Sequence, residues 1–165
     1  TTVEYLATGA LIADADETIN LAIHTPESLA ISQGFCDVNR TSRDSDLPIR
    51  SLPLPKRLIQ SHGVDPDKVR AVYINSDALL GTLDQGNVAL VDTETKFLHE
   101  GCFLICFLNT VIMRLASPIA TGFALTTTNG NIVGTTVTVD QHGMLNTKGM
   151  SVIGKIFLKV NMSRL

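Results

Sequence analysis

Short apolar runs separated by turn signals fill the sequence from Leu47 onward, and this pattern constrains the fold most strongly. Runs of about 4–8 β-branched, aromatic and aliphatic residues between Gly, Pro, Asn and Asp clusters are typical of β-strands. Asn129-Gly130 is a type I′ hairpin signal. The pattern predicts a mainly β domain that is small, twisted and partly barrel-like, with one or two short helices. The expected strands are 69–74, 88–92, 102–108, 110–115, 123–127, 132–139 and 151–160, and the expected helix is 56–61.

The composition suits one domain with an attached segment. Of 165 residues, 44% are hydrophobic and 18% are charged, so the chain can bury a core and is not wholly disordered. The net charge is −3 and no cluster of Lys and Arg occurs. We therefore expect no binding of a nucleic-acid backbone by this chain alone.

The first 46 residues lack the regularity of the rest. Residues 1–9 read as the last turns of a helix, because their apolar residues share one face and Gly9 stands at a C-cap position. Residues 10–46 contain acidic and polar runs and read as a linker or loosely packed arm, with a short strand around Leu21–Ile23. Residues 47–165 form the expected β domain.

No segment reads as a targeting signal or a membrane anchor. The first residues lack the basic start and the apolar stretch of a secretory leader. The most apolar segment, 102–113, is interrupted by the turn-like pair Asn109-Thr110 and is shorter than the roughly 20 residues that span a bilayer. We expect this segment to be a hairpin and the protein to be cytoplasmic.

Cysteines and histidines occur without the spacing of a metal site. The three cysteines are odd in number, so we expect buried thiols in a reducing cytosol. The four histidines stand singly in polar or loop-like settings, and we expect no metal and no cofactor. These residues are Cys36, Cys102 and Cys106, and His24, His62, His99 and His142.

Several short motifs occur in a fixed order between Val69 and Val160. They are Ser76-Asp77-Ala78-Leu79, Thr82-Leu83, Gly86-Asn87, Val88–Asp92, Glu100-Gly101, Ile112–Leu115, Thr127–Gly130 and Ile153–Ile156. In order and spacing they resemble the C-terminal domain of LexA and the lambdoid phage repressors, the Ser–Lys self-cleaving family. The resemblance implies that family's fold. It also implies that residues 1–9 end a helix-turn-helix domain whose remainder is absent.

The resemblance also implies a chemistry that this sequence lacks. In the family a serine hydroxyl attacks a peptide bond of its own chain, and a neutral lysine takes the proton. The serine position is Ala78 and the lysine position is Met113, neither of which can do so. The Ala-Gly or Cys-Gly bond that the family cuts is also absent. We expect a pseudo-peptidase with a vestigial dyad, flanked by Ser76, Asp77, Leu79 and Arg114.

Other interpretations remain open at this point. If Ala78 is an engineered replacement of a serine, the natural protein would be a self-cleaving Ser–Lys peptidase, although that change would not explain Met113. Ser76 could replace the nucleophile, but Lys96 and Lys155 lie on other elements, and a turn-forming serine is the simpler reading. A third interpretation is a peptide- or ligand-binding module that uses the vestigial cleft.

Without protease chemistry, the resemblance implies a domain that holds protomers together. Joining two helix-turn-helix domains raises avidity by about 10²-fold or more when the geometry allows. An apolar strand near the chain end suits symmetric pairing, although its side chains could equally fill the core. The candidate dimer or tetramer interface is Ile156, Phe157, Leu158, Lys159 and Val160.

These expectations combine into one functional prediction. The chain is predicted to be the oligomerisation and regulatory domain of a non-cleavable prophage repressor that maintains lysogeny in the bacterial cytoplasm. Operator DNA would be bound only through the missing N-terminal domain. Because family members without the dyad are inactivated by a bound antirepressor protein, an antirepressor is the expected partner.

Overall fold

The computed structural model of the chain describes residues 3–6, 17–35 and 44–162. Strands dominate these ranges, so the prediction of a mainly β protein with one or two short helices is confirmed. The strands are β1 Val3–Leu6, β2 Thr18–His24, β3 Ser51–Pro55, β4 Val69–Tyr73, β5 Val88–Asp92, β6 Gly101–Phe107, β7 Thr110–Ile119, β8 Gly122–Thr126, β9 Thr135–Val137 and β10 Met150–Asn161. The α-helices are α1 Pro26–Ser32 and α2 Lys56–Gln60, and the 3-10 turns are η2 Asp44–Asp46 and η3 Pro66–Lys68.

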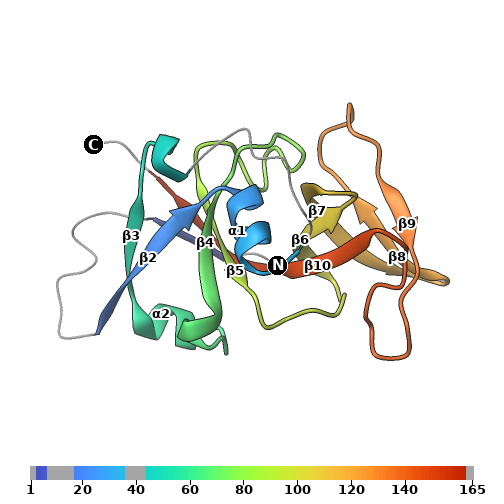
Figure 1. Cartoon of the computed structure of the whole chain (residues 1–165), viewed down its shortest axis with the longest axis horizontal. Coiled ribbons are helices and arrows are strands. Elements are labelled where there is room, and N and C mark those ends of the chain that lie inside the picture. Colours follow the sequence, from blue (N-terminus) through green and yellow to red (C-terminus); the bar gives the residue numbers. More distant parts are fainter. Residues whose placement is uncertain (1–2, 7–16, 36–43, 163–165) are drawn as a thin grey trace.

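One continuous mixed sheet organises the molecule. Its strand order is β3-β2-β4-β5-β10-β6-β7-β8-β9, with β1 attached in parallel to the end of β10. β3 and β9 are the two ends of this path, so the sheet is open and the expected barrel-like closure is not present among the described strands. β10 runs through the middle and joins the β2–β5 half to the β6–β9 half (Figure 1).

The β6–β7 hairpin forms where the sequence predicts it. Leu108 and Asn109 have φ angles of 47° and 64°, which is the left-handed pair that a type I′ turn requires. The type I′ turn predicted at Asn129-Gly130 is not formed, because neither residue has a positive φ. β8 and β9 are instead joined by a longer loop, in which the Ile132 N–H donates to the Asn129 carbonyl at 3.1 Å. The turn signal is local, whereas the β8–β9 register is decided by the rest of the sheet.

Three groups of buried side chains form the core. We call the first the α1 cluster, because Leu29 and Ala30 of α1 pack in it with residues of β4–β7 and β10. The second lies between β2–β3 and the β4–β5–β10 strands, and the third lies on the β6–β9 half. The α1 cluster consists of Leu29, Ala30, Val72, Ile74, Leu79, Leu83, Ala89, Val91, Cys102, Leu104, Cys106, Met113, Ile153 and Ile156.

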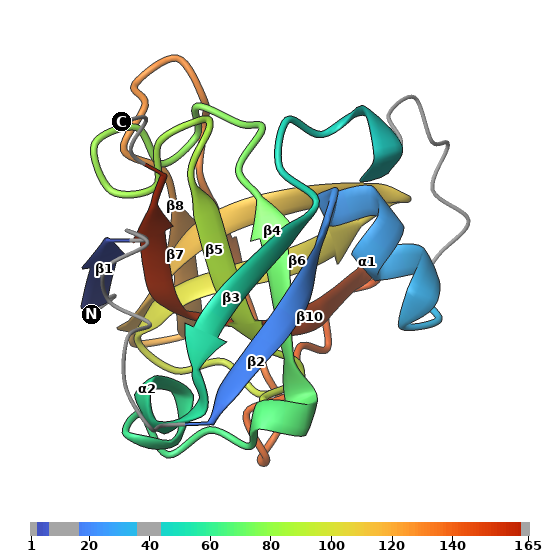
Figure 2. The ribbon, with the colours of Figure 1, turned by 90° about the vertical axis from the view of Figure 1, so that its left-hand side faces the viewer.

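The expectation of a loosely packed arm is wrong for the described part of residues 10–46. The short strand predicted around Leu21–Ile23 is confirmed, but it belongs to a longer β2 that pairs with both β3 and β4. The next element, α1, buries Leu29 and Ala30 completely. Figure 2 shows β2 and β3 side by side, with α1 following β2. The sequence did not indicate their full extent, because only one face of each element is buried and the other face carries polar residues.

Residues 3–6 are a strand and not the end of a helix. β1 pairs in parallel with β10, with Val3 opposite Leu158 and Leu6 opposite Asn161 (Figure 2). Four residues cannot distinguish the 3.6-residue period of a helix from a strand by apolar spacing alone, and tertiary pairing decides the outcome. No helix in the described residues is long and apolar enough to cross a bilayer.

Candidate functional site

Ala78 lies in the loop after β4, at the start of a helical turn. Ala78 is only 1% exposed. The turn is closed by a hydrogen bond from the Leu83 N–H to the Leu79 carbonyl, at 2.7 Å. The Ser76 hydroxyl accepts a hydrogen bond from the Ala78 N–H at 3.1 Å. Ser76 therefore acts as a turn residue, as predicted.

The loop between β8 and β9 closes over Ala78. The N–H groups of Thr128 and Asn129 both donate to the Ala78 carbonyl, at 3.0 and 3.3 Å. The Thr128 hydroxyl donates to the Leu80 carbonyl at 2.7 Å, and the Asn129 amide donates to the Asp77 carbonyl at 3.3 Å. These four hydrogen bonds hold together two segments that are far apart in the sequence, and they leave Ala78 buried beneath them.

Met113 lies in β7, opposite Leu104 of β6, and is 3% exposed. It belongs to the α1 cluster together with Leu79 of the loop and Leu29 of α1. The structure thus packs Leu79, the residue beside Ala78, and Met113 into one apolar core. A lysine at position 113 would be desolvated there, but the thioether present has no basic nitrogen to take a proton.

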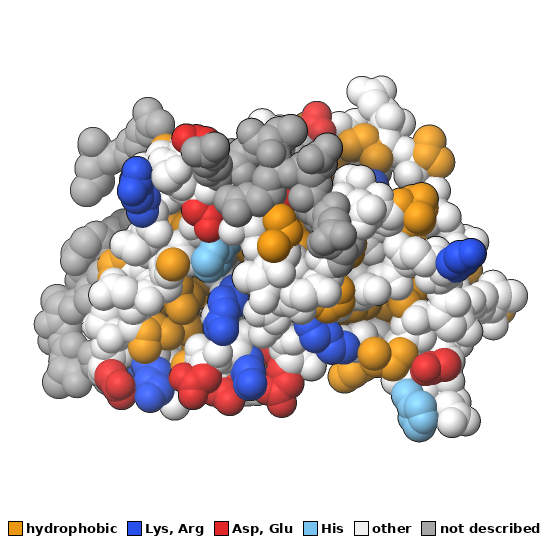
Figure 3. All heavy atoms as spheres, viewed as in Figure 1, with side chains coloured by type: hydrophobic (Ala, Val, Ile, Leu, Met, Phe, Trp, Pro, Cys, Tyr) orange, Lys and Arg blue, Asp and Glu red, His pale blue; other side chains and the backbone are white. Residues whose placement is uncertain are grey.

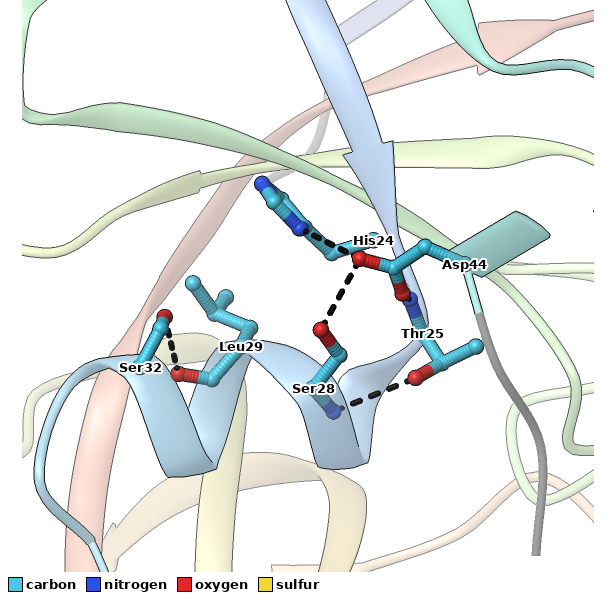
Figure 4. Close-up of polar contacts among 6 residues, drawn as sticks. All are labelled: His24, Thr25, Ser28, Leu29, Ser32 and Asp44. Carbon is cyan, nitrogen blue, oxygen red and sulfur yellow. Dashed lines mark hydrogen bonds and ion pairs between the residues drawn. The ribbon is translucent and has the colours of Figure 1, made fainter. Parts of the chain in front are cut away.

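Helix α1 is anchored by a polar cluster that we call the Asp44 latch (Figure 4). Thr25 caps the helix by accepting the Ser28 N–H at 3.1 Å, and Pro26 occupies the first turn, where its missing N–H costs least. Asp44 accepts hydrogen bonds from the Thr25 N–H and the Ser28 hydroxyl, both at 2.9 Å. The carboxylate also lies 2.9 Å from His24 Nδ1. η2 is thereby joined to the end of β2 and to the start of α1.

The Asp44 latch contains Ser, His and Asp but is not arranged as a catalytic triad. In a triad the histidine lies between the serine and the carboxylate, so that it can take the hydroxyl proton. Here the carboxylate lies in the middle, and Ser28 donates directly to it. Burial alone would raise the pKa of Asp44, but the hydrogen bonds from Thr25, His24 and Ser28 outweigh it and lower that pKa. The arrangement stabilises an anion and does not activate a nucleophile.

Arg114, next to Met113, and Lys96 each donate a hydrogen bond to a backbone carbonyl. Arg114 donates to the Met113 carbonyl at 2.8 Å, and burial lowers the pKa of its guanidinium. The Lys96 ammonium donates to the Ile153 carbonyl at 2.6 Å and lies 4.8 Å from the ring centre of Phe35. Burial lowers the pKa of Lys96 against the opposing effect of the Asp92 carboxylate. Lys96 thus connects β10 to Phe35, in the segment that follows α1.

The histidines make separate local contacts. His62 packs on the ring of Phe157, and His99 lies between the rings of Phe97 and Phe103. Burial, and next the charge of Lys155, lower the pKa of His99. Within residues 3–6, 17–35 and 44–162, no group of three His, Cys, Asp or Glu side chains is placed to hold a metal ion.

The structure contradicts the predicted oligomer interface on β10. β10 is not an edge strand, because it lies between β5 and β6 and also carries β1. Ile156, Leu158 and Val160 are at most 1% exposed, and Phe157 is 7% exposed. Lys159 of the same strand is half-buried. The apolar side chains fill the core of their own chain, so they are not available to a second copy in this fold.

Two of the three cysteines lie in β6. Cys102 and Cys106 are buried, at 5% and 4% exposure, as predicted. Cys106 is part of a disulfide, so the expectation of a thiol is wrong at this position. Spacing along the chain cannot reveal such a bond, because pairing depends on tertiary proximity. Cys36 lies outside the described residues.

Two pockets lie away from Ala78 and Met113. One, of about 390 Å³, is lined by Phe35, Cys106, Leu108, Asn109 and Ser151, with two glycines. The other, of about 530 Å³, lies near the end of β10. Its lining is Pro48, Ile49, Tyr73, Gln85, Gly86, Asn87 and Met162. Neither is lined by Ala78 or Met113, so neither corresponds to the predicted cleft.

Sequence reasoning missed the helix that covers Met113. A signal for it was present, since Thr25-Pro26 places an N-cap residue before a proline, the usual start of a helix. The contribution of Asp44 had no such signal, because the latch joins residues that are distant in the sequence. No family model matches the chain, and no curated protein matches it.

Proposed function

We propose that this chain is the oligomerisation and regulatory domain of a non-cleavable phage or prophage transcriptional repressor of the LexA-like type. The observation that carries the proposal is the ordered motif set of residues 69–160, in which Ala78 and Met113 occupy the positions of the nucleophile and the base. The mainly β fold and the strand–turn–strand setting of Ala78 agree with it.

The burial of both dyad positions supports a role without peptide-bond cleavage. Ala78 is enclosed by hydrogen bonds from residues 128–129, and Met113 is buried in the same cluster as Leu29 of α1. A scissile peptide would need to reach a hydroxyl and an amine in near-attack geometry, and neither group is present at these positions. What remains is a rigid β scaffold suited to joining protomers, with release from DNA brought about by a bound antirepressor protein.

Incubation with an activated RecA–single-stranded DNA filament tests the absence of cleavage. The chain should keep its intact mass, whereas LexA treated alongside as a positive control should be cut. A specific pair of fragments from this chain would overturn the non-cleavable assignment.

Sedimentation equilibrium across a wide concentration range tests the oligomerisation role. We expect reversible self-association to a dimer or a higher even-numbered state. A strict monomer at every concentration would overturn the proposed function.

A further inference from the structure

Strand β10 changes its neighbour along one edge. β6 pairs with β10 from Met150 to Ile156, and β1 pairs with it from Leu158 to Asn161, while β5 occupies the opposite edge. Without β1, the backbone of Leu158–Asn161 would have no strand partner on the β6 side among the described residues. We call this stretch of backbone the β10 acceptor edge. A strand edge of this kind is a template for pairing with another chain.

The two ends of the sheet path are poor sites for adding a strand. β3 carries Pro53 and Pro55, each of which lacks the N–H that a new ladder needs. β9 is only three residues long. Among the described strands, the β10 acceptor edge is therefore better suited to strand addition than either end.

Exposed hydrophobic side chains are spread over many elements. The large ones among the described residues lie on α1, on β7 and in several separate loops. On the face that Figure 3 shows, hydrophobic side chains form separate small groups among charged and other side chains. A large contiguous apolar patch is the usual mark of association through a face. The described surface therefore favours association through strand pairing.

The link between β1 and β2 is short for the strands that it connects. β1 is parallel to β10, β10 and β4 are each antiparallel to β5, and β4 is parallel to β2, so β1 and β2 run in the same direction. Three strands, β10, β5 and β4, separate them in the sheet path. Connections between parallel strands usually need a dozen or more residues, and here residues 7–17 make the link. A short hinge favours exchange of a strand between copies, because the strand then need not pair within its own sheet.

We propose that two copies of this chain associate by exchanging β1, so that β1 of each copy pairs with the β10 acceptor edge of the other. The exchanged ladder is the same as the ladder within one chain, so the backbone pairing is kept. The buried side chains of β10 also stay in their own core. The register places Glu4 opposite Lys159, and opposite charges at facing positions of paired strands stabilise the pairing. The inference rests on the proposed function, because it names the contact through which such self-association would take place.

Two charge reversals distinguish pairing between copies from pairing within one chain. In Glu4→Lys, and separately in Lys159→Glu, like charges face each other at this register position. When the two variants are mixed, opposite charges meet there only if β1 of one variant pairs with β10 of the other. The double variant Glu4→Lys/Lys159→Glu carries the reversed pair within one chain. Sedimentation equilibrium measures each variant alone and the equimolar mixture, and circular dichroism verifies that each is folded.

The matched control is Lys148→Glu, the same reversal at an exposed lysine in the loop before β10. We expect the mixture of Glu4→Lys and Lys159→Glu to associate about tenfold more tightly than either variant alone. The double variant should associate as the unmodified chain does. A mixture of Glu4→Lys with Lys148→Glu should associate no more tightly than Lys148→Glu alone.

Three results would overturn β1 exchange. They are a mixture no tighter than either single variant, an equal gain in the control mixture, and a double variant as weakly associated as the single variants. The proposed function then still stands if the unmodified chain self-associates. An unmodified chain and a mixture that are both monomeric throughout overturn both.

Discussion

Replacing Leu29 with alanine tests whether α1 is an integral part of the core. Leu29 is 0% exposed and packs in the α1 cluster with Leu79 and Met113. Removing a fully buried leucine side chain costs about 2–5 kcal/mol, because apolar burial is lost and a cavity remains. The site lies between a short helix and a sheet, which can close part of the cavity, so we expect a loss of about 3 kcal/mol.

Ile31 provides a matched control on the same helix. Its side chain is 39% exposed, so Ile31→Ala loses less burial and should cost about 1 kcal/mol or less. Urea unfolding followed by circular dichroism measures both free energies of unfolding. For a chain of this length, about 1 kcal/mol corresponds to about 2–4 °C in Tm, so Leu29→Ala should lower Tm by about 6–12 °C.

The comparison of these two variants is decisive for the placement of α1. If Leu29→Ala and Ile31→Ala shift the unfolding midpoint equally and only slightly, α1 is not packed in the core. The covering of Met113 by α1 would then be wrong, and residues 17–35 would again be an arm.

Three further predictions concern the backbone, the Asp44 latch and position 113. Gly122→Ala should destabilise the fold by about 2 kcal/mol or more, because Gly122 has a φ of +148° and an added Cβ would clash with the Val137 carbonyl oxygen. Thermal unfolding measures this loss. Asp44→Asn should cost about 1 kcal/mol at neutral pH, because the amide cannot replace the carboxylate as an acceptor for every donor, and partial exposure moderates the loss. Since the folded pKa of Asp44 lies below its ordinary 3.8, its contribution is present above that value and is lost as pH falls through the folded pKa. Urea unfolding at a series of pH values should therefore show the two proteins converging in acid. Met113→Lys should cost about 3 kcal/mol or more at neutral pH, and less as pH rises, because a buried lysine has a lowered pKa and is then neutral. Urea unfolding at the same series of pH values measures this loss of unfolding free energy.

Each of these predictions has a result that would contradict it. Gly130→Ala is the control for Gly122→Ala, because an added Cβ at Gly130 would meet nothing within 4 Å, and equal effects would refute the clash. A difference between Asp44→Asn and the unmodified chain that persists unchanged in acid would mean that the carboxylate charge is not responsible. A cost of Met113→Lys that does not depend on pH would mean that position 113 is not desolvated.

Local sequence predicted most of the strands because their signals are local. β4, β5 and β6 are continuous apolar runs between turn residues, and each was placed to within a residue or two. The β6–β7 turn was likewise predicted from Asn109-Thr110, although the two left-handed residues are Leu108 and Asn109. Failures occurred where a segment is half polar or very short, as in β1 and α1.

The amino-acid sequence by itself determined that the protein is mainly β and that positions 78 and 113 hold no nucleophile and no base. Those properties depend on side-chain chemistry and short-range pattern. Tertiary structure alone decided that α1 covers Met113, that β10 lies inside the sheet, and that β1 pairs with the end of β10. The physical reason is that burial depends on which strands pair, and pairings such as β2 with β4 and β10 with β5 and β6 join segments that are distant in the sequence.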